Sequence, residues 1–283
     1  MNNQYNYSII IPYRDTFELL RIGINSIPDR EDIEIIIVDN SVHTLDNSQI
    51  PSKQKAKIIY VTSDPTMGAG CARNEGLRHV HGQWILFLDA DDYFSQEAFT
   101  AFDKYLGSIY DIIYFDADSI RLKDGMQSTR HRKIHHYIEV YSHSKKEDVL
   151  RYRFVNPVAK MMRASFVLNS GVLFDEVPAS NDMMFSIRTG HAANKITADP
   201  TKVYMITEGE KNTSLTRTHS KKNQWARYQV YIRQYHFMES IGRKDLRFHL
   251  FTPTLKAFTE LGLCEGFKFL SYAMKERVNI FLR

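Results

Sequence analysis

Four short apolar runs within the first ninety residues most constrain the fold of this 283-residue chain. The runs, at 7–11, 33–38, 58–61 and 84–88, are nearly continuous and rich in β-branched or aromatic residues. Strands buried on both faces of a parallel sheet have this pattern, whereas strands with one solvated face alternate. Residues 17–27 place apolar side chains at three- and four-residue spacing before Pro28, which predicts a crossover helix. The chain is therefore predicted to begin as an α/β sandwich.

The pattern loosens after residue 110, where mixed, partly antiparallel structure is predicted. We expect a strand at 134–140, a turn at 116–118, a basic hairpin carrying His131, His135 and His136, a strand at 202–207 and a mobile polar loop at 208–220. Helices are expected at 144–153, 182–193, 225–241 and 255–282.

Composition limits the classes of protein that this chain can belong to. With 43% hydrophobic and 25% charged residues, it is neither disordered nor fibrous. Cys71 and Cys264 are too few and too far apart for a disulfide framework or a paired-cysteine zinc site. The polar N-terminus lacks a secretory signal profile, and no apolar window is long enough to span a membrane. We expect a cytoplasmic protein, soluble or peripheral on the inner membrane.

Polar residues gather where the predicted strands end. Pro12-Tyr13-Arg14-Asp15, Asp39-Asn40-Ser41 and Asp89-Ala90-Asp91-Asp92 each follow one of the apolar runs. Ligands bind beyond the carboxyl ends of parallel strands. The close carboxylates of the third cluster favour Mg²⁺ or Mn²⁺ together with a phosphate-bearing substrate. A turn and helix-capping cluster is the alternative interpretation.

Residues 68–76 offer backbone amides at a predicted helix start beside Arg73, which is an anion-binding arrangement. The third glycine of the dinucleotide fingerprint is replaced by Arg73, and the segment follows the third strand, not the first. A nicotinamide-dependent enzyme is therefore disfavoured.

Four motifs, at 8–14, 35–41, 70–76 and 87–92, occur in the order found in family 2 glycosyltransferases, and the chain resembles that family. The resemblance is strong over about the first hundred residues, thinner to about residue 217 and absent from the tail. It implies a GT-A fold, with a mostly parallel central sheet flanked by helices. It also implies inverting transfer of a sugar from a nucleotide donor, usually UDP-linked, with Mn²⁺ or Mg²⁺.

The resemblance also implies roles for residues at the strand ends. Pro12, Tyr13 and Arg14 would line the base and ribose pocket, although the family often has Asn at the position of Arg14. Asp39 would bind the base, and Asp89, with Ala90 beside it, would contact the ribose or phosphates. Asp91 would hold the metal. Arg73 and Asn74 would order the rim.

Inverting transfer needs one general base, and the family carries it in a Glu-Asp pair at a helix start. Asn181-Asp182 matches that position, so Asp182 is the candidate base and Asn181 replaces the Glu. Capping of the helix is the alternative role for Asp182. Lys160 is expected either to face the acceptor, as Asn181 would, or to lie on a solvated surface. His219 or Arg217 could reach the phosphates or the metal.

The tail is basic and aromatic, with 12 Lys or Arg against 5 Asp or Glu at 221–283. Its helices could bind an anionic membrane surface, form a dimer or pack onto the catalytic domain. Nucleic acid is not expected as a partner because the rest of the chain is net negative and lacks a recognised binding motif.

The sequence predicts a metal-dependent inverting glycosyltransferase acting on a glycan or lipid-linked glycan of a bacterial surface polysaccharide. Its expected domains are a catalytic domain at 1–220, with a nucleotide-sugar half to about 110 and an acceptor half beyond, and a helical extension at 221–283. A degenerate binding or scaffold subunit and a nucleotidyltransferase are the alternatives.

Overall fold

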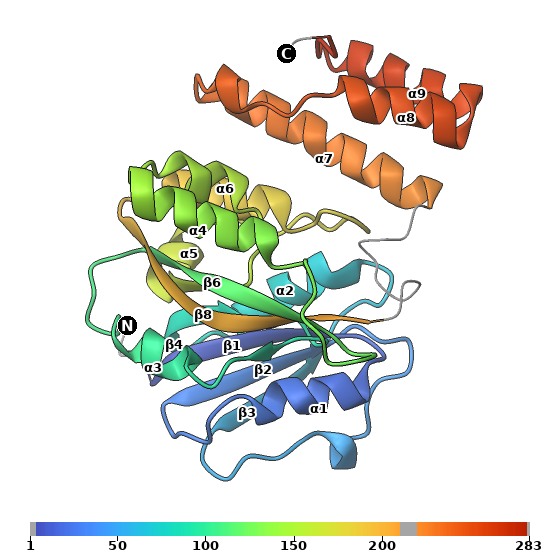
Figure 1. Ribbon diagram of the computed structural model, residues 1–283. Coiled ribbons are helices and arrows are strands. Elements are labelled where there is room, and N and C mark those ends of the chain that lie inside the picture. The colour runs from blue at the N-terminus through green and yellow to red at the C-terminus, as the bar shows by residue number, and fades with distance from the viewer. Residues whose placement is uncertain (1–3, 210–219, 282–283) are drawn as a thin grey trace.

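The computed structural model describes residues 4–209 and 220–281, built around one eight-stranded sheet of order β3-β2-β1-β4-β7-β6-β8-β5 (Figure 1). The strands are β1 (Tyr5–Tyr13), β2 (Ile33–Asp39), β3 (Lys57–Thr62), β4 (Gly82–Phe87), β5 (Tyr93–Phe94), β6 (Ile112–Arg121), β7 (Lys160–Arg163) and β8 (Ile196–Glu208). The first four are mutually parallel, β7 runs antiparallel to β4 and β6, and β8 runs parallel to β6. The predicted α/β architecture with a mixed second half is confirmed.

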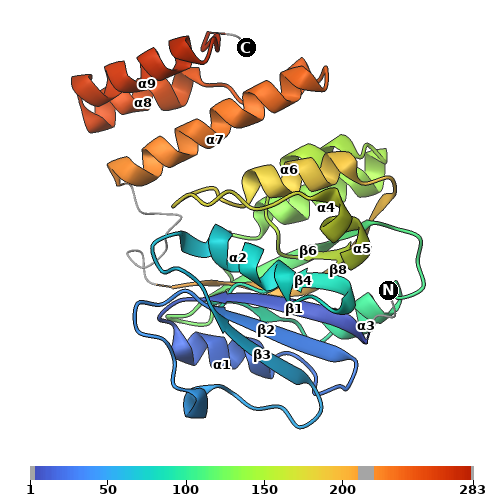
Figure 2. The ribbon, with the colours of Figure 1, turned by 180° about the vertical axis from the view of Figure 1, so that it is seen from behind.

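Helices cover both faces of the sheet (Figures 1 and 2). They are α1 (Phe17–Asn25), α2 (Gly68–Arg78), α3 (Ala98–Asp103), α4 (Arg132–Ser144), α5 (Ala164–Ser170), α6 (Met183–Ala192), α7 (Lys221–Ser240), α8 (Phe251–Leu261) and α9 (Leu263–Lys275). Short 3₁₀ turns at Asn47–Gln49 and Lys244–Leu246 and a π-helical turn at Val149–Arg153 complete the assignment.

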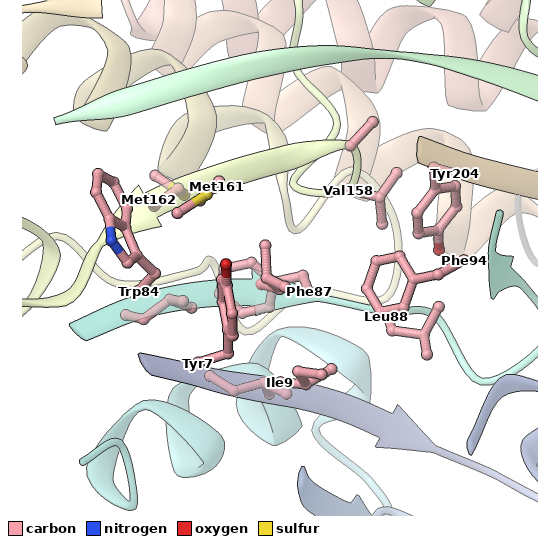
Figure 3. Close-up of a cluster of buried hydrophobic side chains, with 14 of the residues drawn as sticks. Tyr7, Ile9, Trp84, Phe87, Leu88, Phe94, Val158, Met161, Met162 and Tyr204 are labelled. Atoms are coloured by element: carbon pink, nitrogen blue, oxygen red, sulfur yellow. The ribbon is translucent and has the colours of Figure 1, made fainter. Parts of the chain in front are cut away.

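Alternate residues of β1 pack in opposite directions, which explains why its apolar run is continuous. Ile10 faces α2, where Gly76 allows a close approach: a Cβ there would lie 2.5 Å from the Ile10 side chain. Tyr7 faces the other layer and packs edge-on against Phe99 of α3, with ring centroids 5.8 Å apart. Figure 3 shows this core, in which Trp84 and Phe87 of β4 join Tyr7 and Ile9.

Residues 134–140 form part of α4, so the predicted strand and basic hairpin are wrong. The buried side chains, Ile134 and Ile138, are four residues apart, with Tyr137 and Tyr141 partly buried beside them. This spacing places them on one face of a helix. The apparent alternation of the sequence therefore came from a helical stripe.

Three other boundaries also differ from expectation. Asp116-Ala117-Asp118, predicted as a turn, lies inside β6 at an irregularity in its pairing with β8. The segment 144–153 is not one helix, because α4 ends in a left-handed residue at Lys145 before the π-helical turn. The predicted helix at 255–282 is split into α8 and α9 at Gly262, whose φ of 98° suits glycine.

The tail forms a three-helix layer that packs on the sheet domain through α7 (Figures 1 and 2). Val230 and Met238 of α7 contact an apolar cluster that includes Met184 and Ile187 of α6. The other face of α7 contributes Tyr228, Tyr235 and Trp225 to a separate core with α8 and α9. Tyr231, Phe237 and Phe248 of the tail pack against the cluster shared with the sheet domain, whereas most of the other buried tail aromatics lie in the core within the tail itself.

Among the helices in the described ranges, none combines the length and apolarity needed to cross a bilayer.

Candidate active site

Between β1 and β4 the order of strands in the sheet switches sides, although the two strands are parallel. From β1 the sheet continues to β2 and β3 on one side and to β4 on the other. Ligands of open α/β sheets bind outside the carboxyl ends of strands at such a point. Ile10 pairs with Phe87, so Pro12 and Asp89, two residues further along each chain, leave the sheet at the same level. The polar segments that follow β1, β2 and β4 therefore share one rim.

Asp39, the last residue of β2, is fully buried and held by three donors. The backbone amides of Ser41 and Leu45 donate to its carboxylate at 2.8 and 2.9 Å, and the Tyr60 hydroxyl donates at 2.6 Å. Burial opposes the charge, but these hydrogen bonds outweigh it and lower the pKa of Asp39. The carboxylate is therefore ionised and fixed in position.

Pro12 and Tyr13 end β1 beside this carboxylate, and Arg14 begins the following loop. Burial and then the charge of Asp39 raise the pKa of Tyr13, which keeps its hydroxyl protonated. Arg14 is exposed, and its guanidinium makes a long hydrogen bond, 3.4 Å, to the Pro65 carbonyl oxygen. The three predicted pocket residues are thus grouped, with Arg14 the most accessible.

Arg73 on α2 joins the two halves of the rim, although it is only 6% exposed. One terminal nitrogen donates to Asp89 Oδ1 at 2.6 Å, and the other donates to Asn181 Oδ1 at 2.8 Å. A guanidinium fork can hold two acceptors in fixed directions, as an ammonium cannot. Asp89 and Asn181, distant in sequence, therefore meet across one side chain, and the Asn181 oxygen is engaged by Arg73.

Asn74, the next residue of α2, fastens the segment that leads into α6. Its side chain accepts a hydrogen bond from the Phe174 amide at 2.8 Å and donates to the Phe174 carbonyl at 3.0 Å. Gly70 lies so close to the same segment that a Cβ would come within 2.2 Å of the Asp175 carbonyl oxygen. Asn74 is 5% exposed, so its contacts position the segment before Asp182.

The three carboxylates after β4 have different surroundings. Asp92 is 5% exposed and accepts hydrogen bonds from the Tyr204 hydroxyl at 2.9 Å and the Thr207 amide at 2.7 Å. Burial, followed by the charges of Asp91 and Asp89, raises the pKa of Asp92 well above its usual value. Asp91 lies at the exposed edge of this cluster, where partial desolvation and then the charge of Asp89 raise its pKa.

This excess of negative charge fits a divalent cation. Within the described ranges, no group of three or more His, Cys, Asp and Glu side chains is arranged to hold a metal ion alone. Mg²⁺ is commonly bound by one or two carboxylates, with substrate phosphates and water completing its shell. Asp91, with Asp89 beside it, meets that requirement. His219 and Arg217, also predicted to face the phosphates or metal, lie outside the described residues.

Asp182 occupies the N-cap position of α6, but its side chain makes no capping hydrogen bond. The capping interpretation is therefore wrong for this side chain. Burial raises the pKa of Asp182, while the charge of Arg73 and, more weakly, that of Lys160 oppose the rise. A carboxylate with a raised pKa is suited to accepting a proton near neutral pH.

Lys160 is only 3% exposed, which rules out the solvated-surface interpretation. Its ammonium donates to the Phe154 carbonyl at 2.8 Å and lies over the rings of Phe154 and Tyr114, at 4.8 and 5.1 Å. Burial lowers the pKa of Lys160 to about 7, and the Asp182 carboxylate opposes that shift. Lys160 is therefore placed to act on Asp182 electrostatically.

The backbone is strained next to both residues. Ala159, before Lys160, and Ser180, two residues before Asp182, have φ values of 54° and 58°. Non-glycine residues avoid this left-handed region, and such conformations cluster at functional sites. The fold therefore constrains the backbone at both residues.

Two residues of the rim were missed by sequence reasoning. Arg130 is half-buried, donates to the Thr207 carbonyl at 2.7 Å, and its charge lowers the pKa of Asp91. Tyr204 accepts a hydrogen bond from the Asp89 amide at 3.0 Å. No local motif marks either residue, because each reaches the rim through the pairing of β6 with β8.

Comparisons with known proteins identify the family of this chain. The model of Glycosyl transferase family 2 matches residues 8–168. TarS, a poly(ribitol-phosphate) β-N-acetylglucosaminyltransferase of Staphylococcus aureus, is 22% identical over 74% of this chain and 37% of its own length. A poly(ribitol-phosphate) β-glucosyltransferase of Bacillus spizizenii is 31% identical over 32% of this chain and 16% of its own. The chain thus spans well under half of these curated relatives.

Solved structures share the fold over nearly the whole chain. TarS residues 1–349 with UDP-GlcNAc superpose with a TM-score of 0.59 at 16% identity, covering 96% of this chain and 72% of TarS 1–349. The mannosyltransferase PcManGT of Pyrobaculum calidifontis, with GDP-Man and Mn²⁺, gives 0.53 at 14% identity, covering 97% and 76%. These matches confirm the predicted GT-A fold. With the family model matched over more than half of its residues, the chain belongs to glycosyl transferase family 2.

Proposed function

We propose that this protein is a metal-dependent inverting glycosyltransferase that moves a sugar from a nucleotide donor to a hydroxyl group of a glycan acceptor. The observation that carries the proposal is the bridge made by Arg73 between Asp89 and Asn181. It brings the acidic cluster of the nucleotide half beside Asp182, whose carboxylate interacts with the charges of Arg73 and Asp89. A carboxylate for the acceptor and carboxylates for the donor thus share one rim.

The donor would bind along the ends of β1, β2 and β4. Half-buried Pro12 offers an apolar edge to a base, whereas Tyr13 and Asp39 are buried, so the proposed contact of the Asp39 carboxylate with the base requires the loop after β2 to shift on binding. A UDP-sugar is our preferred donor, because TarS crystallises with UDP and UDP-GlcNAc. When bound, Mn²⁺ or Mg²⁺ at Asp91 would neutralise the departing diphosphate. Arg130 would add positive charge on the same side.

Asp182 would act as the general base of a single displacement. The acceptor oxygen attacks the anomeric carbon while its proton passes to the Asp182 carboxylate. The bond from the anomeric carbon to the diphosphate oxygen breaks, and its electron pair leaves with the nucleotide. Arg73 and Lys160 would keep the carboxylate ionised until the proton arrives, since both charges oppose the rise of its pKa.

The relatives favour a phosphate-containing polymer as the acceptor. Two are named poly(ribitol-phosphate) transferases, and a third is the minor teichoic acid biosynthesis protein GgaB of Bacillus subtilis. We propose a related surface glycan, free or lipid-linked, glycosylated on the cytoplasmic side where sugar nucleotides are made.

A panel of nucleotide sugars tests the proposal by thermal shift and by donor turnover, each with and without Mn²⁺. A UDP-sugar is expected to raise the melting temperature only with the metal, and poly(ribitol phosphate) is expected to accept its sugar. Donor binding without hydrolysis or transfer to any acceptor would indicate a binding subunit instead. Release of pyrophosphate from a nucleoside triphosphate would indicate a nucleotidyltransferase.

A further inference from the structure

The layer formed by α8 and α9 lies furthest from the sheet (Figures 1 and 2). It carries several exposed apolar side chains. Leu263, Phe267 and Met274 of α9 are 69%, 62% and 69% exposed, and Phe251 and Leu255 of α8 are 45% and 49% exposed. These five residues, with the half-buried Phe258 and Leu270 and the exposed Phe281, are called the outer apolar face.

The outer apolar face has the spacing of a helix-packing seam. On α9 it follows positions 263, 267, 270 and 274, and on α8 positions 251, 255 and 258. Alternating steps of four and three residues are the repeat by which helices interlock side chains with other helices. The opposite sides of the two helices, with Ala257, Phe269 and Ala273, are already buried in the core shared with α7.

The two seams merge into one surface. Gly266 lies against the Phe258 ring, where a Cβ would come within 2.2 Å, so α8 and α9 pack closely. Phe258 and Phe267 meet edge-on at 5.2 Å, and Phe251 meets Phe281 at 5.8 Å. From the exposed fractions, the surface amounts to roughly 600 Å², the upper end for an isolated monomer. It would supply most of the about 800 Å² that each partner buries in a standard interface.

The charges around the outer apolar face favour a protein partner over a lipid surface. Residues 251–281 contain four basic and three acidic side chains, which leaves a net charge of only +1. Lys268 turns toward α7, with its ammonium 4.4 Å from the centre of the Trp225 ring and 3.7 Å from Glu265. Segments that recognise anionic lipids carry a cluster of about four to eight unopposed basic residues. A nearly neutral apolar surface of this kind can pack against the same surface of a second copy without repulsion between like charges.

We propose that the outer apolar face binds the same face of a second copy of this chain. The α8–α9 hairpins of two copies pack face to face about a two-fold axis and form a four-helix layer. The catalytic rims lie on the far side of α7 in each copy, so association leaves both sites open. This proposal does not depend on the donor, the acceptor or the role of Asp182.

Sedimentation velocity and light scattering across a range of concentration test the proposal on the full chain. The wild type is expected to reach twice the 33.0 kDa of one copy. Leu255→Glu and Phe267→Glu are each expected to raise the dimer dissociation constant by about 100-fold or more, because the two-fold axis buries the new charge twice. Ile109→Glu is the matched control, since Ile109 is equally exposed, at 66%, but lies on the sheet domain.

Circular dichroism melting shows whether each variant is folded. The wild type and the three variants are measured at the same protein concentration. A wild type that stays monomeric, or a dimer that both glutamate variants leave intact, overturns the proposal. Vesicles of phosphatidylglycerol provide the other arm. A monomeric chain that binds these vesicles, with binding lost in both variants but not in Ile109→Glu, would assign the face to lipid and overturn the dimer.

Discussion

Two carboxylates at the same rim, Asp39 and Asp182, have opposite environments. Asp39 accepts three hydrogen bonds, two of them from backbone amides, and its pKa is lowered. Asp182 makes no capping hydrogen bond despite its place at the start of α6, and its pKa is raised. The first carboxylate is stabilised in its charged form by donors that do not move. The surroundings of the second favour its protonated form more than those of the first.

In the function that we propose, this difference separates a carboxylate that holds a ligand from one that takes part in chemistry. A fully satisfied carboxylate gains little by accepting a proton, whereas one balanced by nearby charges can do so at small cost. The protein sets this balance with cations from α2 and β7, which carry Arg73 and Lys160. Exposure differs as well, because Asp39 is fully buried and Asp182 is only partly buried.

The largest effect is expected for Asp182→Asn. Transfer should fall by about 10³-fold, since a general base typically contributes 10²–10⁴-fold. UDP affinity measured by calorimetry should stay within about twofold of the wild type. Asp175→Asn is the matched control: it removes a carboxylate of the same segment that pairs with Arg233 at 3.2 Å. That variant is expected to lose stability while keeping transfer, and equal loss in both variants would show that Asp182 is structural.

Asp91→Ala should weaken metal-dependent UDP binding by about 10- to 100-fold. The control is Asp118→Ala. Asp118, on β6, belongs to a second Asp-Ala-Asp sequence, but its carboxylate forms an ion pair with Lys202 at 3.0 Å. Calorimetry in Mn²⁺ and again in chelator separates the metal-dependent part. Unchanged affinity in Asp91→Ala would show that another residue binds the metal.

Asp39→Asn should affect donor binding and stability, not the chemical step. The amide nitrogen of Asn would face one of the three donors, leaving it unsatisfied at a cost of about 1–3 kcal/mol. Stability contributed by the Asp39 carboxylate is present above its unfolded pKa and is lost as pH falls through its lowered folded pKa. Thermal melting from neutral to acidic pH should therefore show the variant approaching the wild type at low pH. A lower rate at saturating donor would contradict the division of roles.

The smallest effect is expected for Arg130→Gln, which removes one positive charge near Asp91. Donor affinity should fall roughly threefold at low salt and less at high salt, because a half-buried charge is partly screened. Arg132→Gln, on the exposed surface of α4, is the control. A salt-independent change, or an equal change in the control, would argue against a contact with the diphosphate.

The first ninety residues could be read from sequence because their information is local. Each strand is a continuous apolar run, and the polar site residues of β1, β2 and β4 stand at or just after the end of their run, as Asp39 follows Val38. Helix α4 was missed because Ile134, Ile138 and Val140 fit a two-residue period, whereas Ile134 and Ile138 together with Tyr137 and Tyr141 fit a helical one over the same short segment. Tertiary packing of Ile134 and Ile138 on β6 decided between them.

The second half of the site depends on long-range contacts that spacing does not reveal. Lys160 is polar in sequence, yet it is buried between Phe154 and Tyr114, which belong to different elements. Arg130 and Tyr204 reach the rim only after β8 has paired with β6. Asp182 was found by resemblance to a family motif, whereas its tuning by Arg73 and Lys160 is visible only in the structure.

The most direct test of the account is the pH profile of transfer in the wild type, Lys160→Met and Lys160→Arg. Activity should fall as pH drops through the raised pKa of Asp182, and Lys160, whose pKa is about 7, becomes more fully charged as pH falls below 7. Because this charge lowers the pKa of Asp182, Lys160→Met should move the acidic limb to higher pH, and Lys160→Arg should restore it. An acidic limb that stays in place in Lys160→Met would contradict the claim that this carboxylate is the tuned base.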